Sequence, residues 1–370
     1  MANSFGNSIK ISIFGESHSA AIGVVMDGLP SGLTVDLDEV QKEMDRRAPG
    51  RNRLSTPRHE ADVPHVVSGL FHGKTTGTPL CAVIENTNTR SGDYTPSLLR
   101  PSHADYAALC RYHGFADYRG GGHFSGRLTA PLVFAGAVVR PWLHAQGIEI
   151  FAHIKSIGTC APDVPFDAVH PDLAAYRALR GKTLPVLSET AEQAFSDAIE
   201  AARAEADSVG GVIEALITGL PAGLGSPFFE SVESRLSALL FSVPAVKGVA
   251  FGSGFDIARL HGSEANDALY IDEGGAIKTK TNQNGGINGG ITNGMPVCFT
   301  VAVKPTPSIG RPQNTVNVQT GQNETMTIHG RHDPCIVHRA VCVTEACAAL
   351  VAADLLQEAK TYADPASQKN

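Results

Sequence analysis

The chain has 370 residues, of which 42% are hydrophobic and 18% charged, a composition typical of a globular protein and not of a disordered one. Thirty basic and 37 acidic residues give a formal net charge of −7, which argues against non-specific binding to nucleic acid or to an anionic membrane. The seven cysteines include no Cys-x-x-Cys pair, which excludes a zinc ribbon and a disulfide framework and favours a reducing cytoplasm.

Hydrophobic periodicity predicts a mixed chain of strands and helices. In chain order the pattern predicts strands over 11–14 and 22–26, a helix over 37–48, strands over 63–70 and 80–84, helices over 104–112 and 127–147, a strand over 148–157, a helix over 191–207, strands over 211–218 and 295–304, and a helix over 340–358. The helix over 127–147 has no polar face before Arg140, so we expect it to be buried on most sides. No run of about 18 apolar residues and no secretory signal is present, so no transmembrane helix is expected.

Two stretches of the chain resemble each other. Residues 28–33 read Gly-Leu-Pro-Ser-Gly-Leu and residues 219–224 read Gly-Leu-Pro-Ala-Gly-Leu, in each case after a predicted strand and before a helix. This similarity is consistent with an internal duplication, and chance similarity of two turns explains it equally well. Two similar halves with long helices would fit stacked layers of sheet and helix.

An arginine cluster follows the first predicted helix, with the members Arg46, Arg47, Arg51, Arg53 and Arg58. Five guanidiniums within thirteen residues of an acidic chain indicate either a solvated basic loop or a pocket for a molecule with several negative charges. Arginine suits the second alternative because its planar fork donates two hydrogen bonds to one phosphate or carboxylate.

Two glycine-rich segments are candidates for ligand contacts. Residues 119–127 read Arg-Gly-Gly-Gly-His-Phe-Ser-Gly-Arg, and their backbone N–H groups could face a phosphate or the edge of a flavin. Their glycine spacing matches neither the P-loop nor the dinucleotide fingerprint. Residues 282–294 are rich in Asn and Gly, which predicts either a mobile loop or a wrap around a planar cofactor.

Three histidines are candidates for proton transfer: His18, His103 and His332. Each of them alone is more readily explained as a structural residue. A histidine beside arginines and a bound anion is, however, suited to protonate a leaving phosphate near neutral pH. Asp333, next to His332, can belong to a simple turn or be a base held by a cation. No spacing of His, Asp and Glu indicates a metal site.

Taken together, these segments resemble the chorismate synthase family. The resemblance rests on Gly-Glu-Ser-His (15–18) with Asp-Gly-Leu-Pro (27–30), on the glycine run through Arg127, and on Gly-Arg-His-Asp-Pro-Cys (330–335) with Glu345-Ala346. Further matching segments follow the same order along the chain: Thr-Thr-Gly-Thr-Pro (75–79), Arg-Pro-x-His-Ala-Asp-Tyr (100–106), Gly-Ser-Gly-Phe (252–255) and Lys-Pro-Thr-Pro-Ser (304–308). The resemblance therefore extends from about residue 5 to about residue 355.

This resemblance implies an α+β fold, a β-α-β sandwich of antiparallel sheets around long helices, as one domain over residues 1–370 with a frayed tail after about 360. It implies a homotetramer and a lyase that catalyses the last common step of the shikimate pathway. In that step 5-enolpyruvylshikimate 3-phosphate loses phosphate and its C6 hydrogen in an anti-1,4-elimination that gives chorismate. Reduced FMN is the implied cofactor, although the reaction has no net redox change. The chain length is similar to that of the monofunctional, cytoplasmic form, which depends on an external flavin reductase.

The resemblance also implies roles for single residues. His18 would donate a proton to the departing phosphate, His103 would lie near flavin N1, and Asp333 would take the proton of flavin N5. Ser17 and Ser125 would serve as relays. The implied flavin-binding set is His123, Phe124, Ser125, Ala245, Gly289, Lys304, Pro305, Thr306, Pro307, Ser308 and Arg331. The implied cations for substrate or NADP phosphate are Arg47, Arg53, Arg127 and Arg339.

The chain departs from the common family pattern within the glycine run. His123 stands where the family commonly has an arginine, Phe124 where it has a serine, and Leu128 where it has a glutamate. Because of these differences, the family pattern does not define how residues 123 and 124 contact the flavin. A competing hypothesis is a paralogue that binds FMN or an anion without the elimination. Nucleic-acid binding through residues 46–58 is disfavoured by the acidic total charge. Whether the chain reduces its own flavin with NADPH stays open.

Overall fold

The computed structural model describes residues 3–50, 54–55, 60–88, 95–328 and 333–360. Several predicted features lie outside these ranges, namely the roles of Arg53, Arg331 and His332 and the fraying of the tail after 360.

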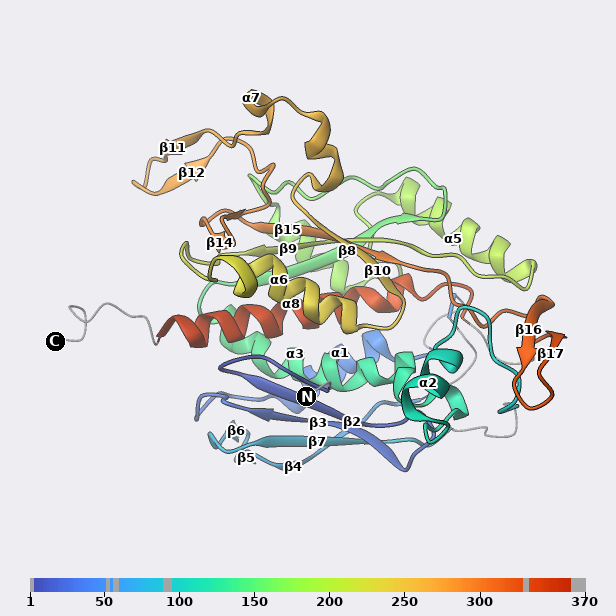
Figure 1. Cartoon of the computed structure of the whole chain (residues 1–370). Coiled ribbons are helices and arrows are strands. Elements are labelled where there is room, and N and C mark those ends of the chain that lie inside the picture. Colours follow the sequence, from blue (N-terminus) through green and yellow to red (C-terminus); the bar gives the residue numbers. More distant parts are fainter. Residues whose placement is uncertain (1–2, 51–53, 56–59, 89–94, 329–332, 361–370) are drawn as a thin grey trace.

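Two antiparallel sheets enclose a layer of helices, as the prediction of an α+β sandwich required (Figure 1). The strands of the first sheet, in spatial order, are β1 (Ser4–Phe5), β2 (Lys10–Gly15), β3 (Ala21–Asp27), β7 (Leu80–Glu85) and β4 (Pro64–Ser68). Those of the second sheet are β10 (Val246–Phe251), β15 (Val297–Val303), β9 (Gly211–Thr218) and β8 (Glu149–Ile157). Every neighbouring pair within the two sheets is antiparallel. The predicted fold class is confirmed.

The middle layer consists of α1 (Leu37–Arg47), α3 (Thr129–His144), α6 (Val232–Ser242) and α8 (Val337–Ala359). Helix α3 packs on the first sheet, α6 and α8 pack on the second, and α3 contacts α8 (Figure 1). At this crossing a Cβ on Gly136 would lie only 2.5 Å from the Cβ of Ala346, so the two helices approach closely because position 136 has no side chain. The predicted burial of α3 is confirmed.

Helix α8 is long and apolar enough to span a membrane by length and composition. In the described part of the chain it is the one helix that meets this test, and 83% of its most apolar window is buried inside the protein. Its apolar faces are therefore those of a central core helix, in contact with both α3 and the second sheet.

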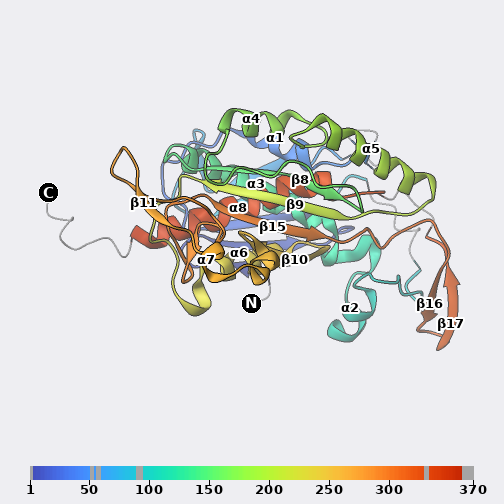
Figure 2. The same ribbon diagram turned by 90° about the horizontal axis from the view of Figure 1, so that it is seen from above.

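Smaller elements surround the sandwich. Helices α4 (Leu173–Ala178) and α5 (Glu189–Ala204) lie beside β8 (Figure 2). The remaining helices are α2 (Asp105–Tyr112), α7 (Gly262–Ala265) and the 3-10 turns η2 (Arg119–Phe124), η3 (Gly126–Leu128), η4 (Leu179–Gly181), η5 (Phe228–Glu230) and η6 (Gly254–Arg259). Four hairpins complete the described elements: β5 (Leu70–Phe71) with β6 (Lys74–Thr75), β11 (Leu269–Ile271) with β12 (Ile277–Thr279), β13 (Ile287–Asn288) with β14 (Ile291–Thr292), and β16 (Gln313–Asn317) with β17 (Gln322–Met326).

Two predicted segments differ from the structure. The single strand predicted over 63–70 is divided into β4 and β5 at Gly69, which has a φ of +81° and lies against the backbone of Leu80. Residues 282–294, predicted either as a mobile loop or as a segment around a planar cofactor, contain the hairpin β13–β14. The Asn282 amide anchors this segment by accepting a hydrogen bond from the Gly286 N–H at 2.6 Å and donating one to the Pro296 carbonyl at 2.9 Å. Ile287 is buried in the main core, so apolar packing and side-chain to backbone bonds together hold the segment.

The two Gly-Leu-Pro stretches occupy equivalent places in the two sheets. Gly28 follows β3 and Gly219 follows β9, with φ values of +84° and +79°. A Cβ on either glycine would overlap a backbone carbonyl, that of Ser8 or that of Gly147. The same turn therefore leads each central strand out of its sheet, and only glycine fits at its first position.

A buried cluster of charged side chains joins β8, β9 and the segment after β8. His153 is completely buried, with its Nε2 3.0 Å from Glu214 and its Nδ1 3.4 Å from Asp163. Burial by itself would raise the pKa of Glu214, but hydrogen bonds from His153 and Lys155 lower it to about 2. The ionised carboxylate of Glu214 therefore stabilises the folded protein.

This shift gives a testable pH dependence. Because the folded pKa of Glu214 lies below its ordinary value of 4.5, its contribution is complete above pH 4.5 and is lost as the pH falls toward 2. We expect Glu214→Gln to lower the free energy of unfolding at pH 7 by about 3 kcal/mol and to flatten its decline below pH 4.5. Urea unfolding from pH 7 to pH 3 measures both effects. Glu273→Gln, at an exposed hairpin tip, is the control. Parallel curves for wild type and Glu214→Gln would contradict the prediction.

Candidate active site

His18 lies in the turn between β2 and β3, which polar contacts hold in shape. The Asn86 amide donates hydrogen bonds to the carbonyls of Glu16 and Ser19 at 2.9 and 2.8 Å, and the Glu16 N–H donates to the Ser19 hydroxyl at 3.0 Å. Ser17 is completely buried, and its N–H donates to the Gly122 carbonyl at 3.1 Å. The turn is therefore joined directly to the glycine run.

The three glycines of η2 bring two histidines together. Gly120, Gly121 and Gly122 all have positive φ values, +61°, +86° and +55°. A Cβ on Gly120 would overlap the ring of His18, and one on Gly121 would lie 3.1 Å from His103 Nε2. The imidazoles of His18 and His103 thus pack against neighbouring glycines. Glycine is required here twice over, by the backbone conformation and by the rings beside it.

His103 is held by an acidic side chain two residues further along the chain. Its Nδ1 lies 2.8 Å from Asp105 Oδ1, and Arg100 forms a two-pronged ion pair with the same carboxylate at 2.8 and 2.7 Å. Burial would raise the pKa of Asp105, but the hydrogen bonds from His103 and Arg100 hold it well below its usual range. Sequence reasoning missed Asp105 and Arg100 as site residues, although both belong to the Arg-Pro-x-His-Ala-Asp segment.

The residues that depart from the family pattern lie next to this pair. His123 Nδ1 is 2.7 Å from the Gly15 carbonyl, so Nδ1 carries the proton of a hydrogen bond to the end of β2. The Phe124 ring is 37% exposed and lies 6.2 Å from the ring of Tyr112. The Ser125 hydroxyl caps η3 by accepting a hydrogen bond from the Arg127 N–H at 3.3 Å.

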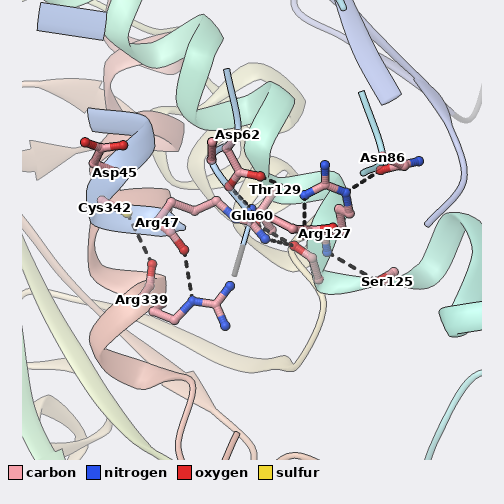
Figure 3. Close-up of polar contacts among 12 residues, drawn as sticks. Asp45, Arg47, Glu60, Asp62, Asn86, Ser125, Arg127, Thr129, Arg339 and Cys342 are labelled. Carbon is pink, nitrogen blue, oxygen red and sulfur yellow. Dashed lines mark hydrogen bonds and ion pairs between the residues drawn. The ribbon is translucent and has the colours of Figure 1, made fainter. Parts of the chain in front are cut away.

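A buried network of arginines and carboxylates joins the end of α1 to the residues that precede α3 (Figure 3). Asp62, whose side chain is wholly buried, pairs with both Arg47 and Arg127, and the distance to Arg127 is 2.7 Å. Arg127 also pairs with Glu60 at 2.6 Å and donates to the Glu85 carbonyl at 2.9 Å. Burial would raise the pKa of Asp62, but the two guanidiniums lower it. Glu60 and Asp62 were missed by sequence reasoning because no motif includes them.

For the described members of the arginine cluster, the structure contradicts one of the two interpretations. Arg46 and Arg47 are largely buried, which contradicts a solvated basic loop. They point to different partners, since Arg46 pairs with Glu43 and Glu345 at 2.7 and 2.5 Å. Arg51, Arg53 and Arg58 lie outside the described residues.

Asp333 and Arg339 meet at the start of α8. Arg339 pairs with Asp333 at 2.7 Å, and its Nε donates to the Arg47 carbonyl at 2.9 Å. Burial lowers the pKa of Arg339 and the charge of Asp333 opposes that effect. Arg339 thus joins the predicted base, Asp333, to the end of α1. Figure 3 shows its bond to Arg47.

The predicted cofactor segment after β15 reaches the His103 loop. Lys304 donates from its backbone N–H to the Ala245 carbonyl at 2.9 Å, and from Nζ to the carbonyl and hydroxyl oxygens of Ser102 at 2.6 and 3.0 Å. Ala245 has a φ of +77°. Two residues further on, the buried hydroxyl of Thr306 has no hydrogen-bond partner in the described part of the protein. The structure therefore brings Ala245, Lys304 and His103 together.

Gly289 is not brought to this place. It lies in the hairpin β13–β14, whose Gly290 packs against Ser231 at the N-terminal end of α6. Ala245 follows the C-terminal end of the same helix, so α6 separates the two predicted flavin contacts (Figure 1).

A cavity of about 560 Å³ lies beside His103, between α2 and β17. Its walls include Gly121 and Phe124 of the glycine run, the charged side chains of Arg100 and Asp105, and apolar residues of which Met326 is one. Both the size and the combination of apolar walls with a few polar groups are typical of sites for small molecules. Within the described ranges, no cluster of three His, Cys, Asp or Glu side chains has the geometry of a metal site.

Comparisons with known family models, sequences and structures all match the same family. A family model described as chorismate synthase matches residues 9–357. A chorismate synthase of Dehalococcoides mccartyi is 45% identical over 357 residues, covering 96% of each protein. One of Lachnoclostridium phytofermentans is 46% identical over 356 residues, covering 96% of this chain and 95% of that protein. A crystal structure of a chorismate synthase superposes with a TM-score of 0.75 at 28% identity, covering 96% of this chain and 93% of the other.

The packing of His18 on the glycine run predicts a large difference between two glycine substitutions. Gly120→Ala places a Cβ in the His18 ring and in a left-handed backbone conformation, so we expect it to lower the free energy of unfolding by about 1–3 kcal/mol. Gly126→Ala is the matched control, because a Cβ there meets nothing within 4 Å. Chemical denaturation of both variants measures the difference. Equal stability of the two would show that His18 does not pack on Gly120.

Proposed function

The chain belongs to the chorismate synthase family, and on that premise we propose how its described side chains divide the work of the family's reaction. The protein is a lyase of the shikimate pathway. It eliminates phosphate and the C6 hydrogen from 5-enolpyruvylshikimate 3-phosphate in an anti-1,4 sense and releases chorismate. The main observation behind the catalytic roles proposed below is that His18 and His103 contact adjacent glycines.

We propose His18 as the general acid for the departing phosphate. An alkyl phosphate leaves poorly as a trianion, and a proton from an imidazolium lowers that barrier. The ring is largely buried, which limits competition from water, and the negative charge of Asp117 lies near enough to interact with it. Ser17, the neighbouring residue, has a buried hydroxyl with no partner among the described residues, which suits a proton relay to a bound ligand.

Asp333 is the proposed proton acceptor. Its carboxylate is paired with Arg339 at 2.7 Å, which holds it at the start of α8 beside the arginine network. Ser125 is proposed as a second relay, since its hydroxyl stands between the glycine run and Arg127.

The described residues fit a flavin next to His103. The orphaned Thr306 hydroxyl is a buried polar atom that a ligand can satisfy. Of the residues proposed to hold the flavin, Phe124 alone lines the cavity of about 560 Å³, so the proposal rests on Thr306 and its neighbours and not on that cavity. Reduced FMN, when bound, supplies electron density to the substrate and recovers it without net redox change. The residues proposed to hold it are His123, Phe124, Ser125, Ala245, Lys304, Pro305, Thr306, Pro307 and Ser308. Gly289 can join them only from another copy of the chain, because α6 separates it from Ala245.

Arg47, Arg127 and Arg339 are the proposed cations for the carboxylates and phosphate of the substrate. Each already has a carboxylate of the chain as its counter-ion. A substrate anion must therefore share a guanidinium with Asp62 or Asp333. The planar fork of arginine allows this because it offers five N–H donors, which lysine cannot match.

We propose a homotetramer in the cytoplasm. The arm formed by β11 and β12 carries exposed apolar side chains, with Leu269 and Ile271 each more than 70% accessible in the single chain, and such surfaces mark interfaces between subunits. All seven cysteines are unpaired, which agrees with a reducing compartment.

The proposed proton transfers predict the behaviour of two histidine variants. His18→Ala and His103→Ala should each retain the fold and lose about 10²–10⁴ in turnover, the usual contribution of a general acid or base. The measurement is an anaerobic assay with photoreduced FMN, which removes any dependence on a reductase. His170→Ala, at an exposed site, is the control. Collapse of the melting temperature in both variants would show that these histidines are structural.

A second prediction concerns the source of reduced flavin. We propose that an external reductase supplies it, so the purified protein with FMN and NADPH in air should give no turnover. Addition of a flavin reductase under anaerobic conditions should restore it. Chorismate formation in air with NADPH alone would contradict this assignment.

A further inference from the structure

A carboxylate next to His103 receives an unusual number of hydrogen bonds. Asp105 Oδ1 accepts from His103 Nδ1 at 2.8 Å and from Arg100 Nη2 at 2.7 Å, while Oδ2 accepts from the backbone N–H of Arg100 at 2.9 Å and from its Nε at 2.8 Å. Four N–H groups thus converge on one carboxyl group whose side chain is 14% exposed. Charge-assisted bonds of this kind are short and strong.

These contacts determine where the proton of His103 resides. An ionised carboxylate has only acceptor oxygens, so a ring nitrogen 2.8 Å away must carry a hydrogen. Because the pKa of Asp105 is held well below its usual range, the carboxylate is ionised at any pH at which the enzyme works. Nδ1 of His103 is therefore protonated throughout, and only Nε2, the nitrogen beside Gly121, can gain or lose a proton.

The loop that carries His103 is also held from the opposite side. Lys304, at the end of β15, donates from Nζ to the carbonyl and hydroxyl oxygens of Ser102. Ser102 itself has a φ of +60°, an uncommon conformation for a residue with a side chain. Among the described residues, the charged groups that hold this loop are Arg100 and Asp105, which contact the ring, and Lys304 of the second sheet, which contacts Ser102.

We propose that Asp105, held by the fork of Arg100, is a positioning residue that fixes the tautomer of His103 and presents Nε2 at the glycine run. The inference rests on the proposed role of His103 and extends it, since it identifies the reacting nitrogen and the group that selects it. Asp105 touches neither substrate nor cofactor in this assignment. It acts through the imidazole alone.

The decisive variant is Asp105→Asn, which keeps the size of the side chain. The amide can donate to Nδ1, which moves the ring proton to Nε2 in the neutral ring. We expect turnover to fall about 10²-fold or more, with the pH profile of kcat displaced and KM little changed. Glu149→Gln is the matched control. Glu149 forms the same two-pronged pair with Arg177, is 15% exposed and lies at the start of β8 beside no histidine of the site.

Two readouts separate positioning from mere structural support. In a double-mutant cycle, Asp105→Asn should change the turnover of His103→Ala by no more than about twofold, because its effect passes through the imidazole. NMR of protein labelled with ¹⁵N-histidine should show His103, identified by its absence in His103→Ala, with its proton on Nδ1 in the wild type and on Nε2 in Asp105→Asn.

The outcomes are distinct. A wild-type His103 that carries its proton on Nε2 would overturn the inference, and this measurement stands even if Asp105→Asn fails to fold. Full turnover in a folded Asp105→Asn, or a large further loss in the His103→Ala background, would overturn it as well. Full turnover in His103→Ala would instead refute the proposed role of His103, while the tautomer measurement would still decide what Asp105 does.

Discussion

The buried carboxylate of Asp62 joins the parts of the protein on which the candidate site is built. It pairs with Arg47 at the end of α1 and with Arg127 at the start of α3, and its side chain is inaccessible to water. Burial of a carboxylate lowers the free energy of unfolding unless cations and hydrogen bonds surround it. Removing one partner of a buried ion pair therefore destabilises the protein more than the net contribution of the pair to stability suggests, because the other charge stays buried without a partner. Asp62, Arg47 and Arg127 therefore hold one another in place.

The position of Arg127 in turn fixes the glycine run. Only four residues separate it from Gly122, and both Ser125 and Gly126 of that interval are bonded to the network, Ser125 through the Arg127 N–H and Gly126 through the Thr129 hydroxyl. The glycines are thus held at one end by α3 and at the other by the Ser17 turn. Two imidazoles from distant parts of the sequence can then pack on a rigid backbone, which suits a site whose proton donors must be pre-organised.

The described arginines of the candidate site are neutralised by carboxylates of the same chain, and this affects how the site can bind a substrate anion. The carboxylates Glu60, Asp62 and Asp333 balance the arginines of the network, and Asp105 balances Arg100. Among the described residues, Arg47, Arg127 and Arg339 are each paired with a carboxylate, so the substrate anions compete with these internal counter-ions. His123, bonded to the Gly15 carbonyl where the family commonly has an arginine, adds a group whose charge depends on protonation.

The sequence by itself determined most of the long elements, the class of fold and the reaction, although strand β10 was not predicted. Periodicity located the long helices and the central strands because α3, α8 and β9 are long and apolar, and the motifs around His18, Gly120 and Asp333 identified the family. Short irregular pieces, such as the hairpin β13–β14, were missed because its strands have two residues each, too few to show a period, and its side-chain to backbone bonds leave no periodic signal. Which residues meet was decided only by tertiary structure. Asp62 and Glu60 lie in no motif, Gly289 ends on the far side of α6, and Arg46 and Arg47 are neighbours with different partners, because burial and ion pairing act between segments remote in sequence.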